Sequence, residues 1–484
     1  MLPAIDPDDL ALCLRVLAQA EELPPEHPDA VAVRRATGRI FKTVKKQRRN
    51  ERRDAISAAD RAVIAATATG SPNRIDDETE GIPISSTATG SGDASGALAG
   101  TFIRPRPCYI CKQDYTAVDA FYHQLCPSCA AINRGHRDAR TDLTGRRALL
   151  TGGRAKIGMY IALRLLRDGA HTTITTRFPN DAVRRFAAMP DSADWLHRLR
   201  IVGIDLRDPA QVVALADSVA AAGPLDILIN NAAQTVRRSA GAYAPLAAAE
   251  SEPLPDGPLP ELLTFDHVSD AHPSALAGSL SSNPTPHLRG SELSRLALIA
   301  GSATPERIAD ARAIDAGGLV PDLNTVNSWT QRVNEVDPLE LLEVQLCNMT
   351  APFILISRLR AAMATSPARR KYVVNVSAME GVFSRGYKGP GHPHTNMAKA
   401  ALNMLTRTSA AELLTDGILM TAVDTGWITD ERPHYTKIRL AEEGFHAPLD
   451  LLDGAARVYD PIVAGEAGTD LYGCFLKDYA RADW

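Results

Sequence analysis

Apolar positions in the first 69 residues recur with a helical period. Leu10, Leu14 and Leu17 lie three to four residues apart on one helix face, and three prolines between positions 24 and 28 interrupt the pattern before a second helix begins near Ala30. The pattern predicts two or three helices over residues 1–69.

From residue 142 onward the apolar pattern alternates between short strands and amphipathic helices. A strand at 148–150 is followed by a glycine turn and by a helix that directs Ile161, Leu165 and Leu166 inward, and further strands are expected at 172–176, 201–208 and 225–234. Such alternation is typical of a parallel sheet, and a strand, glycine turn and helix in that order hold a pyrophosphate at the helix N-terminus. The fold class expected is α/β, a Rossmann-type doubly wound parallel sheet.

Two stretches lack this periodicity. Residues 70–104 are rich in Gly, Ser, Thr and Asp and predict a flexible linker, while residues 237–335 predict an insertion in the α/β domain. The insertion begins Pro-rich and acidic with little expected regular structure, and short helical patterns follow at 291–316. It is interpreted either as a lid or partner surface or as a tolerated loop. The expected domains are a helical basic arm (1–69), the linker (70–104), a cysteine module (105–141) and the α/β domain (142–484).

Composition and charge limit the function classes. The chain has 484 residues, 45% of them hydrophobic, and its formal net charge is −4, so it lacks the basic excess of a polyanion-binding protein. Positive charge is concentrated at residues 31–53, where ten basic residues accompany one acid, for a local charge of +9. We interpret this run as a solvated helix face that packs on an acidic part of the protein or of a partner; nucleic acid is disfavoured because no aromatic residue follows Phe41 within the run.

The N-terminus and the apolar runs bear on localisation. The start of the chain carries three Asp and lacks the features of a signal peptide, and no uncharged apolar run reaches about 18 residues. We therefore expect a cytoplasmic protein without a membrane segment. We further expect a small-molecule substrate, assembly into a homo-oligomer, and a protein partner bound through the basic arm or the insertion.

Four of the seven cysteines form two C-x-x-C pairs. Cys108 and Cys111 are separated from Cys126 and Cys129 by fourteen residues, a spacing that lets four thiolates surround Zn²⁺. With four protein ligands no position is left for water, so the expected ion is structural. Redox dithiols are the alternative, which a reducing compartment disfavours, and His123 is a neighbour of the site or a substitute ligand.

Seven short motifs occur in one order along the chain: TGGRAKIG, DLRD, NNAA, NMTAPF, VNVSA, KAA and VDTGWITDE. Together they resemble the short-chain dehydrogenase/reductase family over about residues 142–484. The resemblance implies an NAD(P)-binding domain in which Gly152, Ile157 and Gly158 form the phosphate turn, Asp205 and Leu206 lie near adenine, Asn231 and Ala232 line the cofactor, and Ile428 and Thr429 lie near the nicotinamide. It also implies that Asn348 anchors a proton-relay water and that Lys399 holds the nicotinamide ribose.

The end of the second strand bears on the choice of cofactor. An acid at this point would bind the ribose 2′-OH of NAD, but the residues are Thr175, Thr176 and Arg177. Arg177, together with Arg154, offers positive charge to a 2′-phosphate, so NADP(H) is favoured over NAD(H). The alternative is that Arg177 caps the sheet edge.

The chain departs from the family pattern at three chemical positions. Lys156 replaces the second glycine of the phosphate turn, where it could contact phosphates or crowd them. Ala378 stands at the place of the catalytic Ser, after Ser377, and Thr395 stands at the place of the catalytic Tyr. An aliphatic hydroxyl is too weak an acid to replace a phenol directly.

The loop before Thr395 carries other candidate proton donors. They are Tyr387 assisted by Lys388, and His394 relayed through Thr395; the alternative is that these are ordinary loop residues. In the tail we expect Trp427, His434 and Tyr435 to contact substrate. The sequence thus supports two hypotheses: an NADP(H)-dependent oxidoreductase acting on a carbonyl, alcohol or imine, or a catalytically inactive NADP(H)-binding regulatory or scaffold protein.

Overall fold

The structure is a computed structural model of the 484-residue chain. It describes residues 5–72, 74, 81, 97–238, 240–265, 268–273, 315–319 and 324–484. Of the stretch 291–316, where short helical patterns were expected, only Asp315 and Ala316 belong to the described residues.

A nine-stranded sheet forms the centre of the molecule, in the order β11-β10-β9-β8-β6-β3-β4-β5-β7. All neighbouring strands are parallel except β10 and β11, which are antiparallel. The strands are β3 (Arg147–Leu150), β4 (His171–Thr176), β5 (Leu199–Gly203), β6 (Ile227–Asn230), β7 (Glu261–Thr264), β8 (Lys371–Ser377), β9 (Ile418–Asp424), β10 (Phe475–Lys477) and β11 (Ala480–Ala482). The prediction of a Rossmann-type doubly wound parallel sheet is confirmed.

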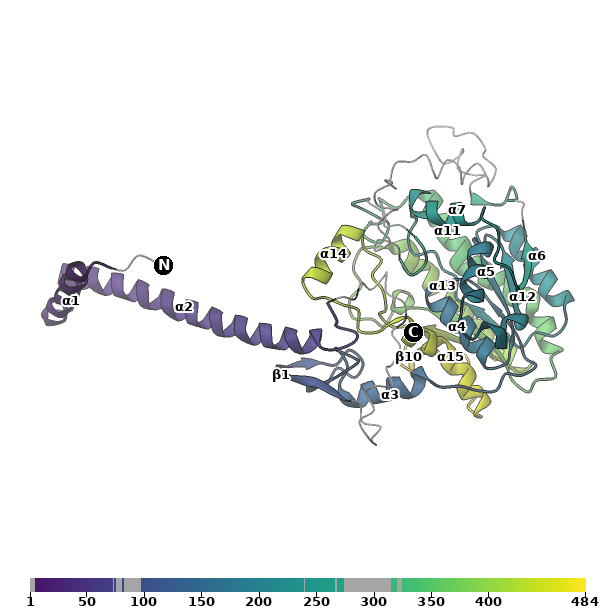
Figure 1. The fold of residues 1–484 in the computed structure, drawn as a ribbon, viewed down its shortest axis with the longest axis horizontal. Coiled ribbons are helices and arrows are strands. Elements are labelled where there is room, and N and C mark those ends of the chain that lie inside the picture. The colour runs from purple at the N-terminus through teal and green to yellow at the C-terminus, as the bar shows by residue number, and fades with distance from the viewer. Residues whose placement is uncertain are drawn as a thin grey trace.

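Helices cover both faces of this sheet, and each face has its own apolar core (Figure 1). One face packs against α4 (Lys156–Arg167), α5 (Pro179–Ala187) and α15 (Leu451–Glu466), and the other against α6 (Pro209–Ala221), α12 (Ala351–Ala364) and α13 (Pro393–Leu414). Strands such as β8 and β9 are buried along their whole length because helices cover both sides. Short elements complete the domain: α11 (Pro338–Gln345), α14 (His434–Glu442), a π-helical turn (Leu346–Thr350) and 3₁₀ turns at Ser192–Asp194, Leu196–Arg198 and Met379–Gly381.

The helical stretch Pro338–Ala364 is apolar and long enough to cross a membrane, and among the described residues no other helix meets both criteria. Its α12 part buries Leu355, Ile356 and Leu359 in the core cluster shared with α6. These contacts are those of a core helix of the α/β domain.

The first half of the insertion is more regular than its composition predicts. It forms a 3₁₀ turn (Ala240–Tyr243), α7 (Ala244–Ala249) and β7, which pairs in parallel with β5 from Arg200↔Glu261 to Gly203↔Thr264. Strand pairing at a sheet edge needs only backbone groups, so polar residues such as Glu261 do not prevent it. The insertion therefore extends the sheet beside the strands that carry the expected nucleotide site.

The N-terminal arm consists of α1 (Pro7–Glu22) and α2 (Pro28–Ala65), and it projects away from the rest of the molecule (Figure 1). Only Ala30 and Asp60 are buried in these helices. Asp60 fixes the base of the arm, because its carboxylate accepts a hydrogen bond from the Ile103 amide at 2.7 Å.

The cysteine module comprises β1 (Leu98–Pro107), β2 (Asp114–Asp119) and α3 (Pro127–Arg137). Strand β1 begins at Leu98, inside the stretch expected to be linker, because Leu98–Pro107 pairs with β2. The module packs on the tail through an apolar cluster that includes Ile428, Leu449 and Leu451. Buried Arg137 strengthens this contact, since its guanidinium donates to both oxygens of Asp450, at 2.6 and 2.8 Å, and pairs with Asp453 at 2.9 Å.

Candidate nucleotide-binding and catalytic site

The turn between β3 and α4 is shaped by two glycines. Gly152 adopts φ 72°, a conformation that favours glycine, and a Cβ at Gly158 would lie 1.9 Å from the Gly152 carbonyl oxygen. Asn231 holds the turn from the next strand, because its side-chain amide donates to the carbonyl oxygens of Thr151 and Gly152, each at 3.0 Å. The turn thus points the N-terminus of α4 at a cavity above the sheet.

A cavity of about 400 Å³ lies at the carboxyl ends of β3, β4, β5 and β6. It brings together most of the residues expected to bind the cofactor: Gly152, Arg154, Lys156, Ile157, Gly158, Arg177, Asp205, Leu206, Asn231, Ala232 and Thr429. Two expected residues do not line it. Ile428 is 3% exposed and packs in the cluster of the cysteine module, and Lys399 is buried at 6% exposure. We call this space the nucleotide cavity.

Aromatic side chains close one end of the nucleotide cavity. The Arg177 guanidinium lies over the ring of Tyr243, 5.0 Å from its centroid, and Tyr243 lies alongside the ring of Phe178, with centroids 5.9 Å apart. Tyr243 comes from the insertion, and nothing in the local pattern around it marks it for this position. Flat apolar faces beside an arginine suit the planar base and the phosphate of an adenosine phosphate.

Asp205 also has a partner that the sequence did not reveal. Its carboxylate pairs with Arg207 at 2.6 Å and lies 3.3 Å from the ring of His272, a residue of the insertion. Burial alone would raise the pKa of the Asp205 carboxyl, but hydrogen bonds from His272 and Arg207 hold it well below its usual range. The charge of Asp205 is therefore compensated within the protein.

Both cations of the phosphate turn contact a short segment of the insertion, residues 315–319. Lys156, whose φ is 52°, forms an ion pair with Asp315 at 3.1 Å, and Arg154 donates to the Gly317 carbonyl oxygen at 2.7 Å and pairs with Asp181. Asp315 is buried, and its carboxylate also accepts the amides of Gly317 and Leu319. Burial would raise the pKa of the Asp315 carboxyl, but the charge of Lys156 lowers it, so the group is ionised near neutral pH.

The polar groups of Asn348 and Ser377 form hydrogen bonds with neighbouring parts of the chain. The Asn348 side chain accepts the Gln234 amide at 2.7 Å and donates to the Gln234 carbonyl oxygen at 2.9 Å. The Ser377 hydroxyl donates to Asn403 at 2.5 Å. Both side chains are buried, and these hydrogen bonds fix the positions of neighbouring parts of the chain.

Thr395 and Lys399 lie one turn apart on α13, and both are buried. The Thr395 hydroxyl makes one long contact, 3.4 Å, with the Thr235 carbonyl oxygen, and the Lys399 ammonium donates to the Val376 carbonyl oxygen at 2.7 Å. Burial lowers the pKa of Lys399 to about 8, and the nearby carboxyl groups of Glu380 and Asp424 oppose this shift. Lys399 therefore holds a proton that it can release near neutral pH.

The loop before α13 does not bring Tyr387 to the cavity. The Tyr387 side chain is 76% exposed, and Lys388 is used to hold the loop, donating to the carbonyl oxygens of Met379 at 2.7 Å and Glu380 at 2.5 Å. His394 is 2% exposed, and neither ring nitrogen has a hydrogen-bond partner among the described residues. Burial lowers the pKa of the His394 imidazole, as does the nearby His392, which favours the neutral ring.

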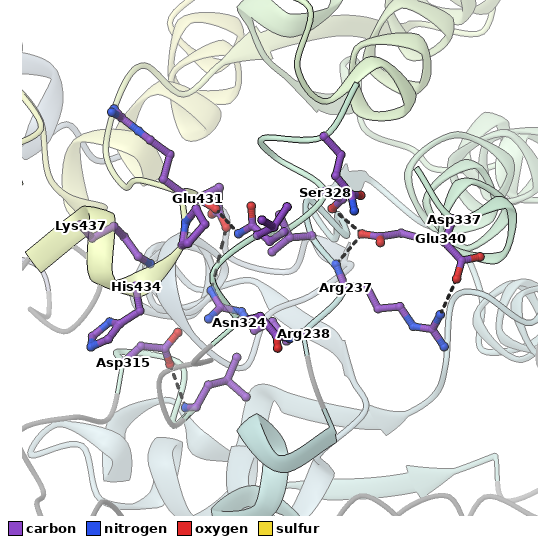
Figure 2. A pocket seen from close by; sticks show the side chains of 17 residues that line it. Arg237, Arg238, Asp315, Asn324, Ser328, Asp337, Glu340, Glu431, His434 and Lys437 are labelled. Carbon is purple, nitrogen blue, oxygen red and sulfur yellow. Dashed lines mark hydrogen bonds and ion pairs between the residues drawn. The ribbon is translucent and has the colours of Figure 1, made fainter. Parts of the chain in front are cut away.

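A second cavity, of about 260 Å³, is shown in Figure 2. It adjoins the nucleotide cavity, and both cavities are lined by Val236, Arg238, Leu319 and Glu431. Its walls come from the stretch after β6, from the insertion, from the start of α11 and from the tail. Of the three tail residues expected to contact substrate, His434 lines this cavity. Tyr435 instead donates to the Thr325 carbonyl oxygen, and the Trp427 amide donates to Tyr109 of the cysteine module.

The four clustered cysteines come together as their spacing predicts. The sulfurs of Cys108, Cys111, Cys126 and Cys129 all lie within 4.8 Å of one another, and those of Cys111 and Cys126 are 3.7 Å apart. This separation is far longer than the bond of about 2.05 Å in a disulfide. His123 takes no place in the cluster, because its ring contacts Thr69 at 2.8 Å and Gln124 at 3.0 Å.

Known proteins match different stretches of this chain. The family described as short chain dehydrogenase matches residues 146–249, which contain the phosphate turn. An uncharacterised protein of Acanthamoeba polyphaga mimivirus is 31% identical over 370 residues, covering 74% of this chain and 71% of that protein. A probable oxidoreductase of Streptomyces antibioticus is 43% identical over 94 residues, which span 19% of this chain and 30% of that protein.

Solved structures that resemble the chain include a short-chain dehydrogenase of Burkholderia cenocepacia in complex with NADP, with 20% identity, a TM-score of 0.42 and coverage of 70% of this chain and 97% of that one. The glycine turn, the strand order and the sequence match to residues 146–249 agree with one another. Over residues 146–249 the chain is similar to the short-chain dehydrogenase family.

Proposed function

We propose that this protein is an NADP(H)-dependent oxidoreductase that acts on a carbonyl, alcohol or imine. The observation that carries the proposal is the nucleotide cavity, which gathers the phosphate turn, Arg177 and Asn231 at the carboxyl edge of the sheet. NADP(H), when bound there, supplies or accepts a hydride. Gly152, Gly158 and the start of α4 would hold its pyrophosphate.

The residues at the end of β4 favour the phosphorylated cofactor. Thr175, Thr176 and Arg177 line the cavity, and no carboxylate stands at this strand end to repel a 2′-phosphate. The exposed Arg177 guanidinium lies over the Tyr243 ring, so a phosphate can reach its N–H groups. Arg154 is committed to Asp181 and Gly317, so Arg177 is the stronger candidate.

For the proton, we propose Lys399 as the donor and the Thr395 hydroxyl as the relay. During reduction Lys399 would give one proton through Thr395 to the substrate oxygen or nitrogen, which would balance the hydride that a bound cofactor would supply to the carbon. Solvent would then reprotonate the Lys399 amine. Support comes from the lowered pKa of Lys399, about 8, and from the single long contact of Thr395. This assignment replaces the exposed Tyr387 as the preferred candidate.

One observation favours a second candidate function, an NADP(H)-binding regulatory or scaffold protein without turnover. Asn348 and Ser377 both make internal hydrogen bonds, and Ala378 and Thr395 lack the acidity of the residues that the family uses. In such a protein the nucleotide would act as a ligand only.

One experiment on the full chain distinguishes the two candidate functions. NADPH and NADH are titrated by calorimetry, and a panel of carbonyl compounds is then tested for loss of NADPH absorbance. The oxidoreductase proposal predicts turnover that is lost in Lys399→Met and that falls as pH rises above about 8, because the donor must be protonated. Binding without turnover would favour the regulatory protein, and no binding of either dinucleotide would overturn both.

Arg177→Met tests the choice of cofactor. Loss of a charge-assisted contact to the 2′-phosphate is worth about 1.5–3 kcal/mol, so we expect the Kd for NADPH to rise by about tenfold or more and that for NADH to stay unchanged. An equal effect on both nucleotides would contradict the proposed contact with the phosphate.

We also propose that the four cysteines hold a structural Zn²⁺. Four sulfurs at a Zn–S distance of about 2.3 Å stand about 3.8 Å apart in a tetrahedron, close to the 3.7 Å between Cys111 and Cys126. Because cysteine fills all four positions, the metal would serve to hold β1, β2 and α3 together and would take no part in hydride transfer. Metal analysis of the purified protein should find one equivalent of zinc.

A further inference from the structure

The second cavity contains two arginines whose guanidinium groups make no hydrogen bond to the described part of the chain. Arg238 meets Glu431 only at 3.9 Å, and Arg237 lies 3.8 Å from Asp337 and 3.7 Å from Glu343. All three separations exceed hydrogen-bond length. The Arg238 side chain is only 16% exposed, so most of its donors face the interior of the cavity and not bulk water.

The carboxylates of the same cavity are mostly occupied. Glu340 accepts the Ser328 hydroxyl at 2.5 Å and the Arg237 amide at 2.6 Å (Figure 2). Asp337 caps α11 through the Leu339 amide at 2.7 Å. Asp315 is held by Lys156 and by two backbone amides. Among the described residues, the Glu431 carboxylate faces Arg238 without a closer partner, so the cavity has more free donors than free acceptors.

The position of Arg238 links this cavity to the nucleotide cavity. Arg238 lines both, whereas Arg237 lines the second cavity alone. A ligand held by Arg237 and Arg238 would therefore end beside the nucleotide. His434 and Lys437 of the tail stand in the wall of the same cavity and add to its basic character.

We infer that the second cavity binds the anionic group of the substrate, a carboxylate or a phosphate, with Arg237 and Arg238 as its donors. Planar guanidinium groups match both anions through paired N–H contacts. The substrate class would be a carbonyl, alcohol or imine that carries such a group. That the anion belongs to the substrate rests on the proposed function, whereas anion binding itself does not.

The test uses malonate, inorganic phosphate and the uncharged malonamide as probes of the full chain, by calorimetry. Wild type should bind malonate or phosphate and not malonamide, and both Arg237→Gln and Arg238→Gln should weaken binding at least tenfold. Arg358→Gln is the matched control, because Arg358 is 47% exposed, like Arg237 at 44%, and pairs with Asp217 on the far helices. Equal thermal midpoints of all variants verify folding.

The choice between the two anions identifies the group: preference for malonate points to a carboxylate, and preference for phosphate to a phosphoryl compound. Binding should persist when NADPH saturates the protein. Displacement by NADPH would place the anion at the phosphate turn and overturn the inference, as would unchanged binding in both variants or no binding to wild type. If NADPH fails to bind but Arg237→Gln still abolishes anion binding, the proposed function fails and the anion site stands.

Discussion

The cysteine module and residues 315–319 and 324–331 of the insertion both lie against the α/β domain, but through different kinds of contact. The module buries an apolar cluster with the tail and adds Arg137, which is 2% exposed and bound to Asp450 and Asp453. The insertion uses the Lys156–Asp315 pair and the stacking of Trp329 on His392, with ring centroids 4.0 Å apart. The first interface excludes water, whereas the second remains partly accessible.

The interface of the cysteine module is therefore structural, whereas a ligand could take the place of the insertion's contact with the phosphate turn. Removing one partner of a buried ion pair leaves an uncompensated charge in the interior, so detachment of the module is strongly unfavourable. Asp315, by contrast, is an anion placed on a cation of the phosphate turn, where a phosphate would exert the same attraction. The insertion therefore competes for the very charges that a nucleotide would use.

The largest effect is expected from Arg137→Met. Asp450 and Asp453 would lose their buried partner, and the free energy of unfolding should fall by about 3–5 kcal/mol, measured by urea denaturation. Arg358→Gln is the control, because Arg358 is 47% exposed and its partner Asp217 is 62% exposed, so this pair should be worth about 1 kcal/mol or less. Equal losses in the two variants would remove the distinction between the interfaces.

The second largest effect is expected from loss of the metal from the cysteine module. Chelation of the wild type, or Cys108→Ser, should remove the zinc and lower the thermal midpoint by about 5 °C or more, because ligand binding contributes to the stability of the folded module. Cys13→Ser, on exposed α1, should change neither quantity. A chelator that removes no metal and leaves the melting curve unchanged would refute the zinc site.

A smaller effect is expected at the insertion, where a substitution should strengthen the binding of NADPH. Asp315→Asn frees Lys156 for the cofactor, so the Kd for NADPH should fall by about fivefold, the equivalent of about 1 kcal/mol. Glu261→Gln removes a pair with Arg200 at 3.0 Å in which the acid is 65% exposed, and should leave the Kd unchanged. Weaker NADPH binding in Asp315→Asn would show that Asp315 orients Lys156 and does not compete.

The smallest effect is expected from Trp329→Leu. The ring stacked on His392 should contribute about 0.5–1.5 kcal/mol, so the free energy of unfolding should fall by no more than that. Phe353→Leu, at a 54% exposed position on α12, serves as the comparison. A loss as large as that of Arg137→Met would mean that the insertion is as firmly attached as the cysteine module.

The fold and the nucleotide end of the site could be predicted because their signals are local. The strand, glycine turn and helix at 147–167 follow one another in the chain, and the parallel strands then bring Arg177, Asp205 and Asn231 to the same edge. The cysteine cluster is equally local, since two short knuckles define it.

The contribution of the insertion could not be predicted. Gly317 lies 163 positions from Arg154, and Tyr243 lies 66 positions from Arg177, so no periodic pattern connects these partners. Composition alone predicted little regular structure for a segment that in fact adds β7 to the sheet.

Sequence comparison with the family pattern exposed the replacements at Ala378 and Thr395, but it could not show how the remaining groups are used. Asn348 was expected to anchor a water, whereas its amide is bound on both sides by the backbone of Gln234. This pairing depends on the packing of the π-helical turn against the stretch after β6, which has no signature in the residue order.

The length of α2 has a consequence for electrostatics. At 1.5 Å per residue its 38 residues extend about 57 Å, and the basic run ends twelve residues, or about 18 Å, before Ala65. The Debye length is about 8 Å at physiological salt, so even the nearest of these charges acts on the domain only weakly. The arm therefore contributes little to steering an anionic cofactor into its cavity, and deleting its charge should leave the association rate of NADPH almost unchanged.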